Sequence, residues 1–200
     1  MSSHLECVLR PATIDGTRRR AQSTPMRYSR RSMASRSPLA LLALAAVCAP
    51  ACGHATFPPS APHPLLGATL PEIHHRQTLD GQPVDAAKLA GHPVLVKFFA
   101  DYCGPCKETL PAAERVHQAH PDVLFLGIDE DESTETARSV AQRFGLTFPV
   151  VHDAGNVLSG RFRVSSMPMT FVADSTGAIR WVGAEGQTEE DIKQAVEAAR

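Results

Sequence analysis

The part of the sequence best suited to chemistry is a cysteine pair, Cys103 and Cys106, within the stretch ADYCGPCKETLP. Two residues separate the cysteines; an apolar run precedes them and a predicted helix follows. Three kinds of site use cysteines at this spacing: a redox couple, half of a zinc site, or a structural disulfide. They differ in what else the chain must supply, so the rest of the sequence discriminates among them.

A structural zinc site requires four ligands, commonly a second cysteine pair or two spaced histidines. Outside the predicted export signal, which holds Cys7, Cys48 and Cys52, the chain has no second cysteine pair, and its histidines are scattered apart from the adjacent His74 and His75. Adjacent residues on a strand point to opposite faces, so no metal site is expected, although two thiolates alone suffice for Cu(I). A disulfide that closes so short a loop removes little unfolded-state entropy. Reversible redox chemistry suits the pair better.

The elements around the pair favour the same interpretation. Residues 94–100 (VLVKFFA) form a nearly continuous apolar run, typical of a strand buried on both faces. A helix is expected from about Cys103 to Ala119, which places Cys103 at the helix N-terminus, where free N–H groups and the dipole stabilise a thiolate. Cys106, one turn further on, would be shielded and would resolve a mixed disulfide.

The remaining pattern predicts an α/β domain, with a central mixed sheet, parallel in its first half, and helices on both faces. A small N-terminal hairpin is expected before the active-site strand, and a strand-helix insert in the middle of the domain. In chain order, the expected elements are a hairpin (73–84), a helical turn (85–91), a strand (94–100), a helix (103–119), a strand (123–128), a helix (133–144), a strand (148–151), a short helix (156–162), a hairpin (169–173 and 178–182) and a closing helix from 188.

The sequence VLVKFFADYCGPCKETLP resembles the active-site strand, CGPC loop and proline-containing helix of thioredoxins. Residues 166–170 (SMPMT), directly before a predicted strand, match the cis-proline loop that faces the CxxC motif in that family. Together with the LDGQPV hairpin, the FPVVHD insert and an export signal, these motifs resemble the TlpA/ResA-like thiol–disulfide oxidoreductases over residues 65–200. The resemblance implies a thioredoxin fold and catalysis by Cys103 and Cys106 without a cofactor.

The same resemblance implies which residues surround the pair. An aromatic wall next to Cys103 and the backbone of the cis-proline loop would bind an extended substrate segment as a short added strand. The expected substrate-binding residues are Tyr102, Gly104, Pro105, Met167 and Pro168.

Two positions depart from the family pattern. Lys97 stands where thioredoxins carry a buried Asp, and Thr109 stands where ResA-like proteins carry a Glu, with Glu108 one residue earlier. Lys97 and Glu108 are therefore the candidate modulators of the cysteine pKa values. One helical residue rotates a side chain by about 100°, which directs Glu108 away from the position of that Glu. The alternative for Lys97 is a side chain that extends to solvent from the end of its strand.

The front of the chain has the layout of an export signal. The first 52 residues hold eight Arg and two acidic residues, and residues 39–49 (LALLALAAVCA) form an apolar run too short to span a bilayer. The rest of the chain holds twelve basic and nineteen acidic residues, and this net negative charge does not favour binding to nucleic acid. Within it, the acidic run 129–132 is predicted to be a solvated loop.

The expected organisation is an export signal (1–52), a Pro-rich tether (53–64) and a thioredoxin-like domain (65–200). Met26 or Met33 is a more natural initiator than Met1, so the first 25 residues are interpreted as a gene-model extension. Residues 49–52 (APAC) resemble a lipoprotein box with Cys52 as the lipidated residue. Cleavage after Ala51 to a soluble form is the alternative.

These features predict a cell-envelope thiol–disulfide oxidoreductase that reduces protein disulfides on the periplasmic side of a bacterial membrane, held there by a lipid anchor. A membrane thiol–disulfide electron donor would re-reduce the pair. The Gly-Pro dipeptide is that of thioredoxins, whose potential of about −270 mV lies well below the roughly −120 mV of a strong oxidase. Two alternatives stay open: a peroxiredoxin-like thiol peroxidase and a Cu(I)-binding module.

Overall fold

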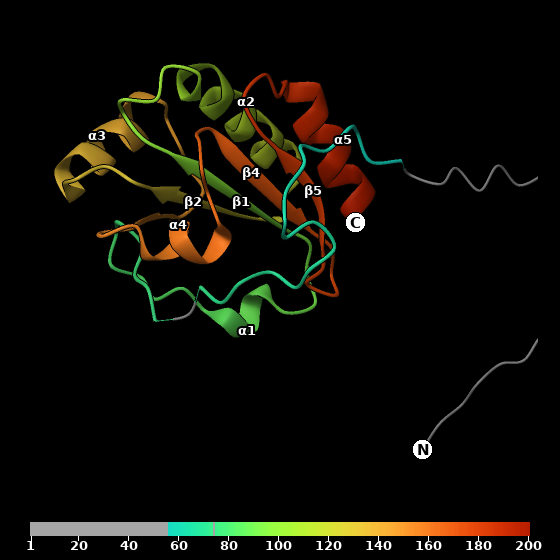
Figure 1. Ribbon diagram of the computed structural model, residues 1–200. Helices are drawn as coiled ribbons and strands as arrows, with labels where there is room; N and C mark the ends of the chain where they lie inside the picture. Colours follow the sequence, from blue (N-terminus) through green and yellow to red (C-terminus); the bar gives the residue numbers. More distant parts are fainter. Residues whose placement is uncertain (1–55, 74) are drawn as a thin grey trace, which may run out of the picture. The chain divides into compact units, whose positions relative to one another are not determined.

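The computed structural model describes residues 56–73 and 75–200, and in this part of the chain five strands form one sheet in the order β3-β2-β1-β4-β5 (Figure 1). The first three strands are parallel, whereas β4 runs antiparallel to β1 and β5 antiparallel to β4. The predicted mixed sheet is confirmed. The strands are β1 (Val94–Phe99), β2 (Leu124–Asp129), β3 (Val150–His152), β4 (Met169–Ala173) and β5 (Ile179–Gly183).

Helices cover both faces of this sheet. Figure 1 shows α2 and α5 on one face and α1 and α4 on the other. The helices are α1 (Ala86–Leu89), α2 (Cys106–Ala119), α3 (Thr134–Arg143), α4 (Val157–Phe162) and α5 (Glu189–Ala199). Because β3 and α4 lie in the chain between α3 and the closing hairpin of β4 and β5, the predicted strand-helix insert is present as well.

The sheet divides the core into two clusters, and successive side chains of β1 alternate between them. Leu95 and Phe99 face the cluster that contains both cysteines and residues of α2, α3 and α5. Val96 and Phe98 face the opposite cluster, to which α4 contributes. Successive strand residues point to opposite faces, so Lys97 points to the cysteine side.

Local signals in the sequence explain where several helices begin. The Ser133 hydroxyl accepts the Thr136 N–H ahead of α3. Thr188 and Asp191 form a reciprocal capping box at the start of α5. Each cap satisfies N–H groups that the first helical turn leaves without a partner, and both helices begin where the sequence predicted them.

Residues 56–64, expected to belong to a tether, pack against the outer edge of β5 instead. The Ala61 N–H donates to the Val182 carbonyl at 2.7 Å, and Trp181 Nε1 donates to the Pro59 carbonyl at 3.1 Å. Prolines keep the segment extended, so that its polar backbone groups meet β5. The packed domain therefore begins earlier in the chain than the sequence suggested.

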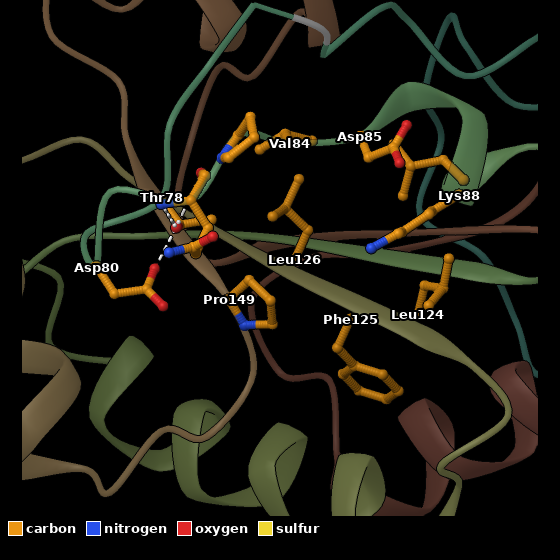
Figure 2. Close-up of a pocket in the computed structure, with 12 residues that line it drawn as sticks. Thr78, Asp80, Val84, Asp85, Lys88, Leu124, Phe125, Leu126 and Pro149 are labelled. Atoms are coloured by element: carbon orange, nitrogen blue, oxygen red, sulfur yellow. Dashed lines mark hydrogen bonds between the residues drawn. The ribbon is translucent and has the colours of Figure 1, made fainter.

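The predicted N-terminal hairpin is present as a turn with isolated bridges rather than as two strands. Gln77 pairs with Pro83, and the Thr78 N–H donates to the Gln82 carbonyl. The turn and α1 border a pocket of about 400 Å³ over β2 (Figure 2). Its floor is largely aliphatic, no cysteine lines it, and the residues around it are Thr78, Asp80, Gln82, Pro83, Val84, Asp85, Lys88, Leu89, Leu124, Phe125, Leu126 and Pro149.

Within residues 56–73 and 75–200, no helix combines the length and the apolar character needed to cross a bilayer. The predicted export signal, the alternative start codons Met26 and Met33, and the lipidation residue Cys52 lie outside the described residues, as does His74.

Candidate active site

Cys103 and Cys106 form a disulfide between the end of β1 and the first residue of α2. The two cysteines differ in access, because 6% of the surface of residue Cys103 is exposed whereas Cys106 is fully buried. An incoming sulfur can therefore reach only Cys103 directly. This asymmetry matches the predicted division between an attacking and a resolving cysteine.

The start of α2 differs from the prediction. The helix begins at Cys106 with Pro105 as its N-cap, so Cys103 lies in the preceding turn rather than in the helix. The Cys106 N–H nevertheless donates to Cys103 Sγ at 3.2 Å. An N–H group at a helix N-terminus stabilises negative charge on the sulfur that it contacts. Cys103 thus receives the predicted support from just outside the helix.

A pocket of about 430 Å³ lies over the exposed side of Cys103. The CxxC turn forms one wall, and the loop before β4 forms the other. Its lining residues are Tyr102, Cys103, Gly104, Pro105, Glu130, Val164, Ser165, Ser166 and Met167. Tyr102 is 71% exposed and stands at the rim. The pocket is open to solvent and suits a segment of another chain better than an enclosed small molecule.

The structure brings most of the expected substrate-binding residues to this pocket. Tyr102, Gly104 and Pro105 line it from the cysteine side and Met167 from the opposite side. The Met167–Pro168 peptide bond is cis, as the resemblance implied. Pro168 itself is not among the lining residues.

The two candidate pKa modulators have different surroundings. Glu108 is exposed on α2, and no hydrogen bond or ion pair joins it to either cysteine. Thr109 takes the buried position instead, and its hydroxyl contacts the Cys106 carbonyl at 3.4 Å. The structure therefore does not bring Glu108 to the cysteine pair.

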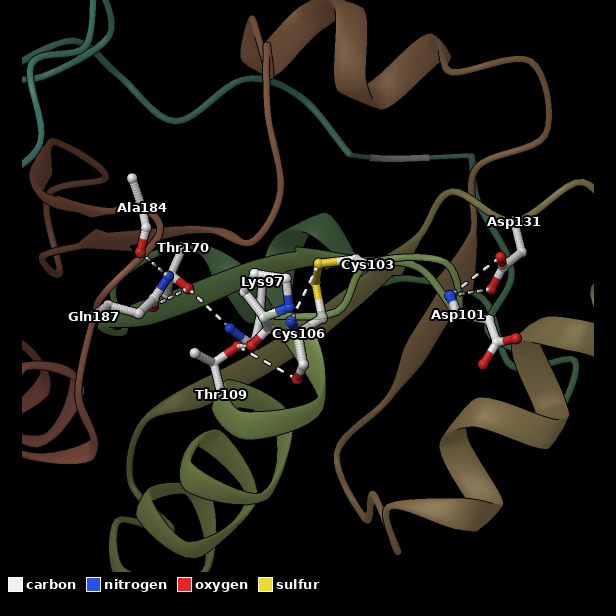
Figure 3. Close-up of a disulfide and its surroundings, with 10 residues drawn as sticks. Lys97, Asp101, Cys103, Cys106, Thr109, Asp131, Thr170, Ala184 and Gln187 are labelled. Carbon is white, nitrogen blue, oxygen red and sulfur yellow. Dashed lines mark hydrogen bonds between the residues drawn. A yellow bond between two sulfur atoms is a disulfide. The ribbon is translucent and has the colours of Figure 1, made fainter.

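Lys97 is completely buried, so the alternative of a side chain that reaches solvent is wrong. Its Nζ donates to Thr170 Oγ1 at 3.3 Å, and the Thr170 hydroxyl donates to Gln187 Oε1 at 2.6 Å. Figure 3 shows this chain of polar groups behind the disulfide, with the Gln187 amide bonded to the Ala184 carbonyl. Burial lowers the pKa of Lys97 to about 7, because a charged amine is disfavoured away from water.

Glu130 is a pocket residue that sequence reasoning missed. It lines the same pocket as Cys103, and its carboxylate accepts a hydrogen bond from the Ser159 hydroxyl. Burial, with a further contribution from the nearby Asp153, raises the pKa of Glu130. The available signal was its place at the carboxyl end of β2, because neighbouring parallel strands end at the same edge of a sheet.

The prediction that residues 129–132 form a solvated loop is wrong, because Asp129 and Asp131 are buried. Both Asp131 carboxylate oxygens accept the Asp101 N–H, at 3.1 and 3.0 Å, and this fixes the turn that leads to Cys103 (Figure 3). Asp129 Oδ1 accepts the Asp131 N–H, whereas its buried Oδ2 has no partner. Burial and the neighbouring Asp131 raise the pKa of Asp129 to about 8.

The curated proteins similar to this chain include a thiol–disulfide oxidoreductase and a thioredoxin-like protein. ResA of Geobacillus thermodenitrificans, a thiol-disulfide oxidoreductase, is 28% identical over 137 residues, which cover 68% of this chain and 78% of that protein. The thioredoxin-like protein YneN of Bacillus subtilis is 27% identical over 122 residues, which cover 59% of this chain and 71% of that protein.

Solved structures give the same picture. A secreted Mycobacterium tuberculosis disulfide oxidoreductase, described as homologous to DsbE of E. coli, aligns with a TM-score of 0.57 at 25% identity, over 62% of this chain and 93% of that one. A thioredoxin-family thiol:disulfide interchange protein of Chlorobium tepidum aligns with a TM-score of 0.60 at 25% identity, over 71% of this chain and 99% of that one.

The fold and the cysteine pair thus agree with the comparisons, and the predicted thioredoxin fold is confirmed. Residues 66–182 match the family described as the AhpC/TSA family. This match spans more than half of the sequence, and the chain therefore belongs to the AhpC/TSA family.

Proposed function

We propose that the thiol–disulfide oxidoreductase chemistry of this chain is the reduction of protein disulfides in the cell envelope. The observation that carries the proposal is the unequal access to one disulfide: Cys103 faces an open pocket and Cys106 is sealed behind it. A couple that exchanges with partner proteins needs one sulfur within reach of the partner and a second that the partner cannot reach.

The reaction follows from that arrangement. In the reduced protein, the Cys103 thiolate attacks one sulfur of a substrate disulfide, and the second substrate sulfur leaves as a thiolate. Cys106 then loses its proton and attacks Cys103 Sγ, which expels the first substrate sulfur as a thiolate. Two electrons pass to the substrate, and the Cys103–Cys106 disulfide forms.

The pocket indicates how the substrate is held. The loop of residues 164–167 faces the CxxC turn across the pocket, and its backbone is the natural partner for an extended substrate segment added as a short strand. Tyr102 at the rim supplies an aromatic surface next to Cys103. We assign Tyr102, Gly104, Pro105, Met167 and Pro168 to substrate binding.

Each turnover leaves the pair oxidised, so a donor must return two electrons. We assign this role to a membrane thiol–disulfide protein, and we place the domain on the periplasmic side of a bacterial membrane. The Arg-rich segment and apolar run ahead of the domain support export, and the related M. tuberculosis structure is of a secreted protein. Cys52 is the proposed site of a lipid anchor.

Thiol peroxidase activity is a second candidate, because the family that matches the chain bears the name AhpC/TSA. A peroxide-consumption assay without added thioredoxin tests it. Turnover of peroxide at a rate comparable with disulfide reduction would favour the peroxidase. If the protein reduces insulin but does not consume peroxide, the reductase is favoured.

Two cysteine variants test the proposed function. We expect Cys103→Ser to abolish reduction of insulin disulfides, because no sulfur remains within reach of the substrate. Cys106→Ser should accumulate mixed disulfides between Cys103 and substrate proteins, visible on non-reducing gels. Faster alkylation of Cys106 than of Cys103 near neutral pH would contradict the assigned roles.

A further inference from the structure

Lys97 occupies a place in the fold that the proposed reaction leaves without a role. It lies on the face of β1 that carries Leu95 and Phe99, and that face packs against the cluster containing both cysteines. Figure 3 shows its side chain extending beneath the CxxC turn, toward the first turn of α2. A lysine in this position is costly to bury, so its presence invites a chemical explanation.

The surroundings of the amine hold no opposite charge. Its strand neighbours in register are Gly127 on β2 and Thr170 on β4. Across residues 56–73 and 75–200, its hydrogen bond is to the Thr170 hydroxyl, and burial alone accounts for its lowered pKa. On α2, the charged residues nearest to Cys106 in sequence, Lys107 and Glu108, are exposed. No carboxylate therefore neutralises an ammonium at this site.

Cys106 is the second group on this side of the sheet that must carry a charge while buried. It is fully buried, and it must lose a proton before it can attack Cys103, since the thiolate is the nucleophile. A buried thiolate without a partner is unfavourable for the same reason as a buried ammonium. A neutral amine and a neutral thiol can be buried together at lower cost, and one proton transfer converts them into an ion pair.

We propose that Lys97 is the proton acceptor for the buried thiol of Cys106, with the amine neutral while the pair is a disulfide and an ammonium while Cys106 is a thiolate. This inference rests on the proposed thiol–disulfide exchange. It ties the protonation of Lys97 to the redox state of the cysteines.

The step balances as follows. In the mixed disulfide, the S–H bond of Cys106 breaks, its electron pair stays on sulfur, and the proton forms a new N–H bond at Lys97 Nζ. The Cys106 thiolate attacks Cys103 Sγ, and the substrate sulfur leaves with the electron pair of the broken S–S bond. The ammonium then passes its proton to water, and the released substrate thiolate takes one from water.

Burial lowers the pKa of Lys97 to about 7, whereas a thiol has a pKa of about 8.5 in water and a higher one when buried. Proton transfer from the thiol to the amine is therefore uphill, and the attraction between the resulting ammonium and thiolate offsets part of that cost. A proton acceptor works best when its pKa lies near the operating pH. An ammonium at Lys97 would stabilise a Cys106 thiolate on the same side of the sheet, whereas a carboxylate at position 97 would oppose the thiolate. A lysine at position 97 is therefore expected to lower the pKa of Cys106, whereas an acidic residue at that position would raise it.

The experiment measures this acidity without any turnover. In the full-length protein, Cys7, Cys48, Cys52 and Cys103 are replaced by Ser, so that Cys106 is the remaining thiol. Its thiolate is titrated by ultraviolet absorbance. We expect Lys97→Met to raise the pKa of Cys106 by about one pH unit or more, and Lys97→Asp to raise it further.

Matched variants exclude a general perturbation. Lys107→Met removes an exposed lysine next to Cys106 and leaves the titration unchanged. Lys97→Gln keeps a hydrogen-bond donor toward Thr170 without a titratable amine, and it behaves as Lys97→Met does. Circular dichroism checks the fold of each variant. A Cys106 titration that is unchanged or shifted to lower pH in folded Lys97→Gln protein overturns the proposal.

A second measurement separates this inference from the proposed function. In protein with both active-site cysteines, the rate at which a preformed mixed disulfide releases its substrate should fall about tenfold or more near pH 7 in Lys97→Met and recover at higher pH. If the thiol titration shifts as expected but the intact pair reduces no protein disulfide, the proposed function fails and the proton acceptor stands. A release rate that keeps its pH profile in Lys97→Met overturns the proton acceptor.

Discussion

The carboxylate of Asp131 accepts the backbone N–H of Asp101 through both oxygens, at 3.1 and 3.0 Å, across thirty residues of sequence. This contact joins the end of β2 to the turn between β1 and Cys103. The reactive sulfur is therefore positioned by a neighbouring strand as well as by the start of α2. A buried acceptor of this kind is costly to lose, because the N–H it serves is left without a partner.

Asp131→Ala should accordingly loosen the turn that carries Cys103. We expect a loss of about 1–3 kcal/mol in the free energy of unfolding, together with a lower kcat/KM for insulin reduction. Urea unfolding and reductase kinetics measure the two effects. Glu132→Ala, at the exposed adjacent position, is the control and should change stability by less than about 0.5 kcal/mol. Equal behaviour of the two variants would remove Asp131 from this role.

The burial of Lys97 makes the stability of the oxidised protein depend on pH. Its pKa is about 7 in the folded state against 10.5 ordinarily, so the unfolded chain binds the extra proton between these values and stability rises with pH across that window. Lys97→Met should be more stable than the parent by on the order of 3–5 kcal/mol below pH 7. The difference should shrink as the pH approaches 10.5. Urea unfolding of the oxidised proteins at several pH values checks this, and a difference that does not vary with pH would contradict it.

Asp129 should give a pH dependence of the opposite sign. Its pKa is raised from 3.8 to about 8 by burial and by Asp131, so the folded state holds a proton that the unfolded chain loses, and stability falls as the pH rises from about 4 to 8. Asp129→Asn keeps an oxygen for the Asp131 N–H. It should match the parent near pH 4 and exceed it by at least about 2 kcal/mol at pH 8. A constant difference in unfolding free energy across this range would refute the prediction.

The segment ahead of residue 65 should contribute to stability. Ser60 and Ala61 exchange hydrogen bonds with Val182 on β5, and Phe57 packs against the core. A chain that starts at residue 56 should therefore unfold at a clearly higher temperature than one that starts at residue 65. Differential scanning calorimetry of the two truncated proteins makes the comparison. Identical melting temperatures would restore the interpretation of this segment as a passive tether.

The proposed lipid anchor depends on Cys52. Detergent phase partitioning of cells that express the parent or Cys52→Ala should place the parent in the detergent phase and the variant in the aqueous phase. Lipidation supplies acyl chains that partition into the detergent phase. Partitioning of both proteins into the aqueous phase would indicate a cleaved, soluble form.

The sequence by itself determined the features that depend on residues close together in the chain. The Cys103–Cys106 spacing, the continuous apolar run of β1 and the capping box of Thr188 and Asp191 each carry their structural meaning within a few residues. Because the order of such elements restricts how a sheet with helices on both faces can be connected, the fold class followed from them. The first residue of α2 was misplaced, since Pro105 rather than Cys103 caps it.

Only the tertiary structure decided what surrounds the cysteine pair. Whether Lys97 reaches solvent depends on the helices that cover β1, and whether Asp129 and Glu130 are exposed depends on what packs against the end of β2. These partners lie tens of residues away in the chain, so the sequence around a charged residue does not show whether that residue is buried. The free energy of a buried charge is set by the groups that replace its water, and those groups are assembled only when the chain folds.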